Sequence, residues 1–100
     1  MHNHGIDLIG IRVELFGRAR LLCGSHTICI EVPTPARVAD IAAALANACP
    51  AFVGKVVCSD MTRLEESYVL NINGKQFVGD QDLNLDKEDS LLLFSSQAGG

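Results

Sequence analysis

The sequence predicts an α+β domain in which one main helix packs across a mixed β-sheet. Several short segments alternate apolar and polar residues with a period of two, which is typical of half-buried strands. One segment between them repeats its apolar residues every three or four positions, as an amphipathic helix does. The run LLLF at 91–94 indicates a final strand in the middle of the sheet, buried on both faces. The length of 100 residues suits one domain and is too short for two.

The first part of the chain predicts an antiparallel hairpin with a long loop. Alternation predicts one strand over 11–16 and a second over 26–32. Between them, Gly17 and Gly24 bracket residues 18–23, which we expect to be too short for a stable helix of their own. The side chains expected on the inner face of the two strands are Ile11, Val13, Leu15, Ile28, Ile30 and Val32.

The main helix is expected directly after the second strand. Thr34 is a plausible N-cap, Pro35 suits the first helical position, and Pro50 ends the helix. Its inner stripe is expected to consist of Val38, Ile41, Ala42, Leu45, Ala48 and Cys49, whereas Ala43, Ala44 and Ala46 form a nearly featureless outer face. The helix therefore serves packing and carries no chemistry of its own.

The second half of the chain completes the sheet. Residues 51–66 give no clear pattern, and 59–66 are expected to form an exposed loop. A strand over 67–73 leads into Asn73-Gly74, which favours a type I′ hairpin turn, because both central positions of that turn need positive φ.

A short returning strand over 75–78 follows the hairpin turn. Residues 79–85 are then expected to form a turn with a brief 3₁₀ piece, whose Leu83 and Leu85 lie under the core. The last strand covers 90–94.

This order of elements predicts the β-grasp architecture of ubiquitin-like domains, with four to five strands. A central C-terminal strand would place the first and last strands side by side and parallel. The chain then divides into a flexible leader at 1–10, the β-grasp domain at 11–94 and an extended tail at 95–100.

The tail ends on Gly99-Gly100, and from Leu91 onward its only charge is the terminal carboxylate. Glycine has no Cβ, so such a terminus can thread through a narrow channel and present its carboxylate to another protein's active site. The alternative is an ordinary frayed chain end.

Composition excludes several functions. The net charge of −4 disfavours non-specific nucleic-acid binding, which requires a basic face. The sequence lacks an apolar run long enough to span a membrane, and its first residues lack the features of a secretion signal. We therefore expect a cytoplasmic protein that binds neither membrane nor nucleic acid.

The reactive side chains form no recognisable catalytic or metal-binding arrangement. Cys23, Cys29, Cys49 and Cys58 contain no C-x-x-C pair, so we expect no metal and free thiols that act mostly as small buried hydrophobes. The interior His26 is expected to face solvent, and no role is assigned to His2 and His4 in the leader.

Taken together, these residues resemble the MoaD/ThiS family of ubiquitin-like sulfur carriers, from about Ile11 to Gly100. The landmarks, in order, are IRVELFG at 11–17, VADI at 38–41 with Leu45, VLNING at 69–74, the acidic turn before Ser90, and Gly99-Gly100.

The resemblance implies that Gly100 is the reactive residue. A ubiquitin-activating-type enzyme would use ATP to adenylate its carboxylate, and a persulfide donor would then convert it to a thiocarboxylate. In MoaD-like members, a larger synthase subunit uses this sulfur to build the dithiolene of molybdopterin. The chain itself would bind no cofactor and have no catalytic machinery of its own, so it would act as the sulfur-donating small subunit of a synthase.

The resemblance also assigns roles near the end of the chain. Ala98 and Gly99 would enter the partner with the tail. Phe94 aligns with an aromatic residue at the partner interface, although it could instead simply complete the core strand. Ser95, Ser96 and Gln97 replace the usual two prolines and apolar residue, and the 59–66 loop is longer than in compact members.

Several functions therefore stay open at this stage. The acceptor could be another pathway, such as thiamine, cysteine or tRNA thiolation, or the chain could be a protein modifier that forms isopeptide bonds through Gly100. A plain interaction module with an incidental tail is the third alternative.

Overall fold

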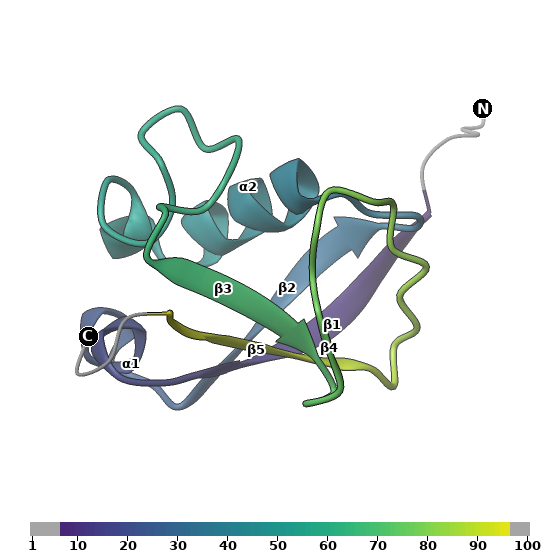
Figure 1. The fold of residues 1–100 in the computed structure, drawn as a ribbon, viewed down its shortest axis with the longest axis horizontal. Coiled ribbons are helices and arrows are strands. Elements are labelled where there is room, and N and C mark those ends of the chain that lie inside the picture. The colour runs from purple at the N-terminus through teal and green to yellow at the C-terminus, as the bar shows by residue number, and fades with distance from the viewer. Residues whose placement is uncertain (1–6, 97–100) are drawn as a thin grey trace.

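The computed structural model describes residues 7–96 and contains one five-stranded sheet with strand order β2-β1-β5-β3-β4. In Figure 1, α2 crosses one face of this sheet, which confirms the predicted α+β, β-grasp fold. The elements are β1 (Leu8–Leu15), α1 (Arg18–Cys23), β2 (Thr27–Pro33), α2 (Val38–Ala48), the 3₁₀ helix η1 (Pro50–Phe52), β3 (Tyr68–Ile72), β4 (Gln76–Phe77) and β5 (Ser90–Ser95).

The strand β5 is central, as predicted. It pairs parallel with β1 on one side, where Val13 lies opposite Leu91, and antiparallel with β3 on the other, where Leu70 lies opposite Leu93. The strands β1 and β2 form the predicted antiparallel hairpin. Because both edges of β5 are bonded, its position is fixed by the two halves of the sheet.

The hydrophobic core lies between α2 and the sheet. The residues that are fully buried there include Ile11, Val13, Leu15, Val32, Ile41, Leu45, Phe52, Leu91 and Leu93. Most of the predicted inner face is confirmed. In α2, however, Ala46 is buried and Ala48 is exposed, because Ala46 lies one turn after the buried Ala42 and continues its stripe.

Residues 18–23 form the helix α1, so the prediction that they are too short for a helix is wrong. Gly24 ends the helix in the left-handed conformation, at φ 77°, and its N–H donates to the carbonyl of Arg20 at 2.8 Å. The helix contributes a fully buried Ala19 to the core. Burial against the rest of the domain, rather than intrinsic helix propensity, stabilises such a short segment.

The start of α2 also differs from the prediction, because its N-cap is Arg37 rather than Thr34. Ala36 and Leu83 instead form a β-bridge, in which each N–H donates to the other residue's carbonyl, at 2.9 and 2.7 Å. The bridge holds residues just before the helix in extended form. It also explains why 79–85 contains no 3₁₀ helix, although Leu83 and Leu85 are buried as expected.

The limits of the domain are wider than predicted. The strand β1 begins at Leu8, so residues 8–10, which were assigned to the leader, pair with β2. The strand β5 continues to Ser95, which was assigned to the tail. The rest of the predicted leader lies outside the described residues except for Asp7, whose carbonyl accepts a hydrogen bond from the Thr34 N–H at 3.2 Å.

The predicted Asn73-Gly74 turn is confirmed, with φ of 58° and 74°. The Asn73 side chain links this turn to the start of β5: its Nδ2 donates to Asp89 Oδ1 at 3.0 Å, and its Oδ1 accepts the Ser90 N–H at 2.8 Å. The hydrogen bonds from Asn73, and then from the Asp86 N–H, lower the pKa of Asp89 from its ordinary value.

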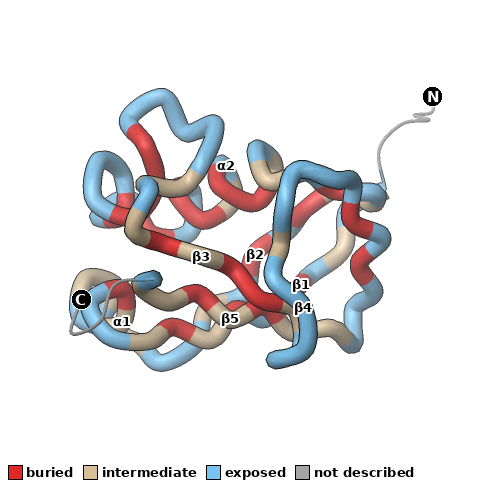
Figure 2. Tube along the Cα trace, in the orientation of Figure 1, coloured by how far each residue is buried: buried red, intermediate tan, exposed pale blue. Residues whose placement is uncertain are grey.

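The sheet is covered on one face only, which corrects the prediction that β5 is buried on both faces. Leu91 and Leu93 are fully buried under α2, whereas Leu92 and Phe94 point to the opposite face and are half-buried. Figure 2 shows this alternation of buried and intermediate residues along β5. We call the side that α2 does not cover the open face. None of the helices in the described residues is long and apolar enough to cross a membrane.

Candidate functional site

The chain leaves the sheet at a fixed point. Ser95 is paired with Tyr68, and the Ser96 N–H and Oγ both donate to the Ser67 carbonyl, at 2.6 and 3.2 Å. These contacts hold β5 against the start of β3 up to the last described residue. The predicted reactive residue Gly100 and the predicted tail residues Gly99 and Ala98 lie outside the described residues.

Phe94, the predicted interface residue, lies between two other aromatic side chains on the open face. Its ring is 6.3 Å from that of Phe16 in an edge-to-face arrangement, and 6.1 Å from that of Phe77. Both separations fall in the range where aromatic pairs attract each other. Phe94 is half-buried and is not part of the core cluster, so it does not merely complete the core.

Each neighbour of Phe94 is positioned by a local feature of the sequence. Phe77 follows the Asn73-Gly74 turn in β4 and is 62% exposed. Phe16 follows β1 directly, and its ring is covered by the Arg20 guanidinium of α1, at 5.6 Å from the ring centroid. Arg20 is held there because its Nε donates to the Leu15 carbonyl at 3.1 Å.

Two apolar side chains extend the aromatic cluster across the sheet. Val69 is paired with Phe94, and Leu92 lies on the same face of β5 one pleat away. We define the phenylalanine patch as Phe16, Val69, Phe77, Leu92 and Phe94. It lies beside the point where the chain leaves the sheet.

A buried asparagine lies within this apolar surface. Asn71 is paired with Leu92 on one side and Phe77 on the other, and the residue is only 7% exposed. Its Oδ1 has no hydrogen-bond partner among the described residues. Unpaired buried polar atoms are rare in folded proteins, so Asn71 is the most unusual residue of the open face.

Sequence reasoning identified Phe94 but missed Phe16, Phe77, Arg20 and Asn71. For Asn71 the two-residue period of β3 and β5 carried the missing signal, because it places Val69, Asn71, Leu92 and Phe94 on one face. Reading 91–94 as buried on both faces concealed that signal.

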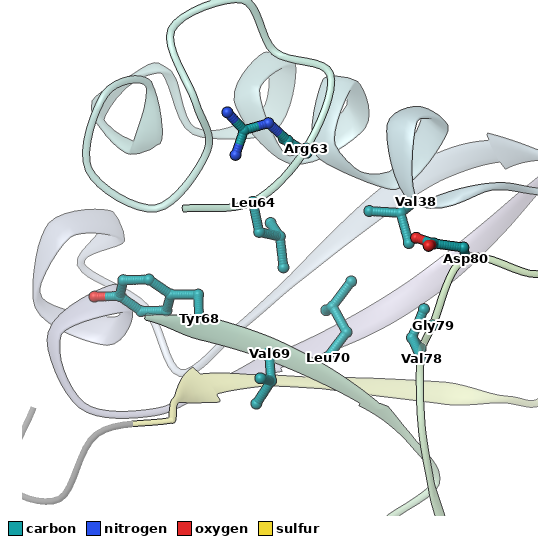
Figure 3. Close-up of a pocket in the computed structure, with 9 residues that line it drawn as sticks. All are labelled: Val38, Arg63, Leu64, Tyr68, Val69, Leu70, Val78, Gly79 and Asp80. Carbon is teal, nitrogen blue, oxygen red and sulfur yellow. The ribbon is translucent and has the colours of Figure 1, made fainter. Parts of the chain in front are cut away.

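A second depression of about 210 Å³ lies on the helix-covered side of the sheet. Figure 3 shows Leu64, Leu70 and Val38 converging on it from the 59–66 loop, β3 and α2, with Arg63 and Asp80 at its rim. It shares Val69 with the phenylalanine patch, and its other lining residues lie outside that patch.

All four cysteines are free thiols, as expected, but only Cys49 and Cys58 are buried, whereas Cys29 is exposed. Burial raises the pKa of the Cys58 thiol, and burial together with contact with Cys49 raises that of Cys23. His26 faces solvent, as predicted. Within residues 7–96, no group of three His, Cys, Asp or Glu side chains is arranged to hold a metal ion.

Comparison with solved structures places the fold among known proteins. The crystal structure of small archaeal modifier protein 1 from Haloferax volcanii is 27% identical and superposes with a TM-score of 0.73, over 91% of this chain and 99% of that one. A Pyrococcus furiosus structure described as a "putative molybdopterin converting factor, subunit 1" is 25% identical, with a TM-score of 0.65 over 87% and 97%.

A third structure supports the fold alone. The solution structure of small archaeal modifier protein 1 from Methanosarcina acetivorans is 19% identical and has a TM-score of 0.73 over 94% of this chain and 99% of that one. No family model and no curated protein sequence matches the chain.

The fold and the exit of its central strand define a ubiquitin-like β-grasp protein. More narrowly, the chain is similar to MoaD/SAMP-type proteins, since its structural neighbours include small archaeal modifier protein 1 and the structure described as a molybdopterin converting factor subunit.

Proposed function

We propose that the chain is a sulfur carrier whose Gly100 carboxylate becomes a thiocarboxylate, and that it acts as the small subunit of a molybdopterin synthase. The main support is the position of β5, which is bonded on both edges and tied to Ser67 at its end. The proposed reactive residue therefore lies four residues beyond a point that is fixed in the fold.

The distance that the tail must cover supports this role. Four residues follow Ser96, and a fully extended segment of that length spans at most about 14 Å. The partner's reactive centre must therefore lie within that distance of Ser96. A partner that docks on the phenylalanine patch, beside this point, meets the requirement.

The proposed chemistry takes place entirely in partner proteins. The activating enzyme couples the Gly100 carboxylate to AMP from ATP and releases pyrophosphate. The terminal sulfur of a cysteine persulfide then displaces AMP, and a second thiol reduces the resulting acyl disulfide. This leaves a thiocarboxylate on Gly100, while the two cysteines are oxidised to a disulfide. The carrier holds the sulfur at high effective concentration inside the acceptor enzyme.

Phe94 is proposed as an anchor in a pocket of the partner, since partly exposed aromatic side chains are common interface hot spots. Its contacts with Phe16 and Phe77 support this assignment, because they fix the ring before binding. Gly99 and Ala98 are proposed to occupy the narrow channel that leads to the partner's active site, where larger side chains would not fit.

The proposal is tested by the intact mass of the full chain after incubation with its activating enzyme, ATP and a persulfide donor. Thiocarboxylation replaces one oxygen by sulfur and adds about 16 Da. A variant that lacks Gly100 serves as control and should gain no mass. Absence of the gain in the complete chain would contradict the sulfur-carrier role, and a gain without molybdopterin formation by the larger subunit would contradict the pathway.

A second candidate, a protein modifier, is favoured by the similarity to small archaeal modifier protein 1. In that case the activated Gly100 carbonyl forms an isopeptide bond with a lysine amine, and AMP leaves. Immunoblots of native extract should then show a ladder of conjugates that disappears when Gly100 is deleted. A single free band would count against this candidate.

A further inference from the structure

The outer edge of β2 offers unpaired backbone groups. The Leu15 N–H donates to the His26 carbonyl at 2.8 Å, and the Thr34 N–H donates to the Asp7 carbonyl at 3.2 Å. Antiparallel hydrogen bonds recur at every second residue, so the even-numbered residues from 26 to 34 face β1. Cys29 and Glu31 therefore direct both their N–H and C=O groups away from the sheet, and these groups have no partner among residues 7–96.

This edge is not blunted in the usual ways. Natural sheets protect edge strands with lysine, proline, bulges or a covering segment. The strand β2 is regular over its pairing with β1, and its proline stands only at the last position, Pro33. Two successive outward-facing residues thus remain available for pairing with another strand.

A shallow apolar groove of about 610 Å³ runs beside this edge, between β2 and α2. The small side chains on the outer face of α2 create it, because alanines leave room where larger residues would fill the space. Among the residues that line it are Pro33, Ala43, Ala44, Ala46, Val53 and Met61. Val53 and Met61 form part of its wall and are 37% and 44% exposed.

The charged residues that line this groove are all acidic. Glu31 and Asp40 line it, and its lining contains no basic residue. The nearby Arg37 does not neutralise them, since its Nε pairs with Asp82 at 3.2 Å. A ligand with basic side chains would therefore complement the groove.

We propose that the outer edge of β2 and the groove beside α2 bind an extended segment of a partner protein that alternates basic and small apolar residues. The segment adds a sixth strand to the five-stranded sheet by hydrogen bonding to Cys29 and Glu31. Its apolar side chains enter the groove beside the alanines of α2, and its lysines or arginines point to the opposite face of the sheet, where the Glu31 side chain lies, because Ile30 and Val32 on either side of Glu31 are buried under α2.

The charges on the chain disfavour a second copy as the occupant. Pairing two β2 edges would bring Glu31 and Asp40 of both copies together, and each chain carries a net charge of −4. The proposed site also lies at the β2 edge of the sheet, away from the β4 edge that carries Phe77. Binding there is therefore independent of Gly100 and of the proposed sulfur chemistry.

The test is an NMR titration of the ¹⁵N-labelled full chain with the acetylated and amidated peptide Lys-Val-Lys-Val-Lys-Val. The amides of Cys29 and Glu31 should shift, and their hydrogen exchange should slow. A Glu-Val-Glu-Val-Glu-Val peptide is the control and should leave both unchanged. Binding should weaken as salt is raised, because the attraction is partly electrostatic.

Two variants show whether the groove takes part. Ala43→Arg fills the groove and should weaken binding of the lysine peptide by about tenfold, which corresponds to about 1.4 kcal/mol. Ala39→Arg adds the same charge at another exposed position of α2, outside the groove, and should change the affinity by less than about twofold.

Unchanged exchange of the Cys29 and Glu31 amides at saturating peptide would overturn the proposal, as would equal weakening by the two variants. Protection of the same amides without peptide, together with a doubled mass in ultracentrifugation, would overturn it in favour of self-association. A chain that lacks Gly100 should still bind the peptide, so failure of the proposed sulfur chemistry is distinguishable from failure of this site.

Discussion

Asn71→Leu is expected to stabilise the protein, although it replaces a buried residue at the centre of the sheet. The Asn71 Oδ1 has no hydrogen-bond partner within residues 7–96, and only 7% of the residue is exposed. Folding therefore removes this oxygen from water without replacing the lost hydrogen bonds. Leucine has nearly the same shape as asparagine, so it can fill the space between Leu92 and Phe77 without that loss.

The size of the effect follows from the cost of an unsatisfied buried polar group, about 1–3 kcal/mol. Part of this gain is offset because leucine also removes the amide nitrogen of Asn71, which is not among the buried unpaired atoms of residues 7–96. We therefore expect the free energy of unfolding to rise by about 1–2 kcal/mol. For a domain of this size, each kcal/mol raises Tm by about 4–8 °C.

Urea denaturation followed by circular dichroism measures this change. The midpoint should rise while the m-value stays constant, which shows that stability rather than compactness has changed. Asn84→Leu, at an exposed position whose side chain forms no hydrogen bond to residues 7–96, is the control and should stay within about 0.5 kcal/mol of the original chain. Destabilisation by Asn71→Leu would contradict this expectation, because it would mean that the Asn71 amide is satisfied in the folded protein.

Three further changes address the interface, the start of β5 and the thiols. Phe94→Ala should weaken binding to the activating enzyme or synthase subunit by about 2 kcal/mol or more in calorimetry; unchanged affinity would contradict its role as an anchor. Because hydrogen bonds hold the pKa of Asp89 below 3.8, its stabilising effect is present above that pH and is lost as pH falls through the lower, folded-state pKa. Asp89→Ala should therefore lose less stability than the original chain between neutral pH and about pH 3 in urea titrations, and equal losses would argue against the link to Asn73. Iodoacetamide should label the exposed Cys29 well before the buried Cys58, whose pKa is raised, and mass spectrometry after a short exposure reveals the order; simultaneous labelling would contradict the burial of Cys58.

Periodicity sufficed to predict the sheet and the main helix. Alternation at Ile11, Val13 and Leu15 identified β1, and the Asn73-Gly74 pair identified the turn between β3 and β4, because each depends on local chemistry alone. The β-bridge between Ala36 and Leu83 was not predictable in this way, since it joins residues far apart in the sequence. Because of that contact, α2 begins later than predicted and residues 79–85 contain no helix.

The candidate site was predictable only in part, for a similar reason. The resemblance to known carriers pointed to Phe94. The residues that contact Phe94, however, depend on which strands are neighbours in the sheet. Phe16, Phe77 and Asn71 meet on the open face only because β1, β5, β3 and β4 adopt one particular order. The four consecutive apolar residues at 91–94 could not reveal that one face of β5 is not covered by a helix. A strand that is buried on both faces would have the same sequence pattern.

The central place of β5 has a consequence for the nascent chain. Until Ser90–Ser95 has left the ribosome, β1 and β3 have no strand between them, and Leu91 and Leu93 are missing from the core. Pairing between strands that are far apart in the sequence is slow to form, and an incomplete sheet exposes strand edges that are prone to aggregation. Truncated chains that end before Ser90 should therefore be unfolded and degraded by proteases. Only chains that include β5 should accumulate in the cell.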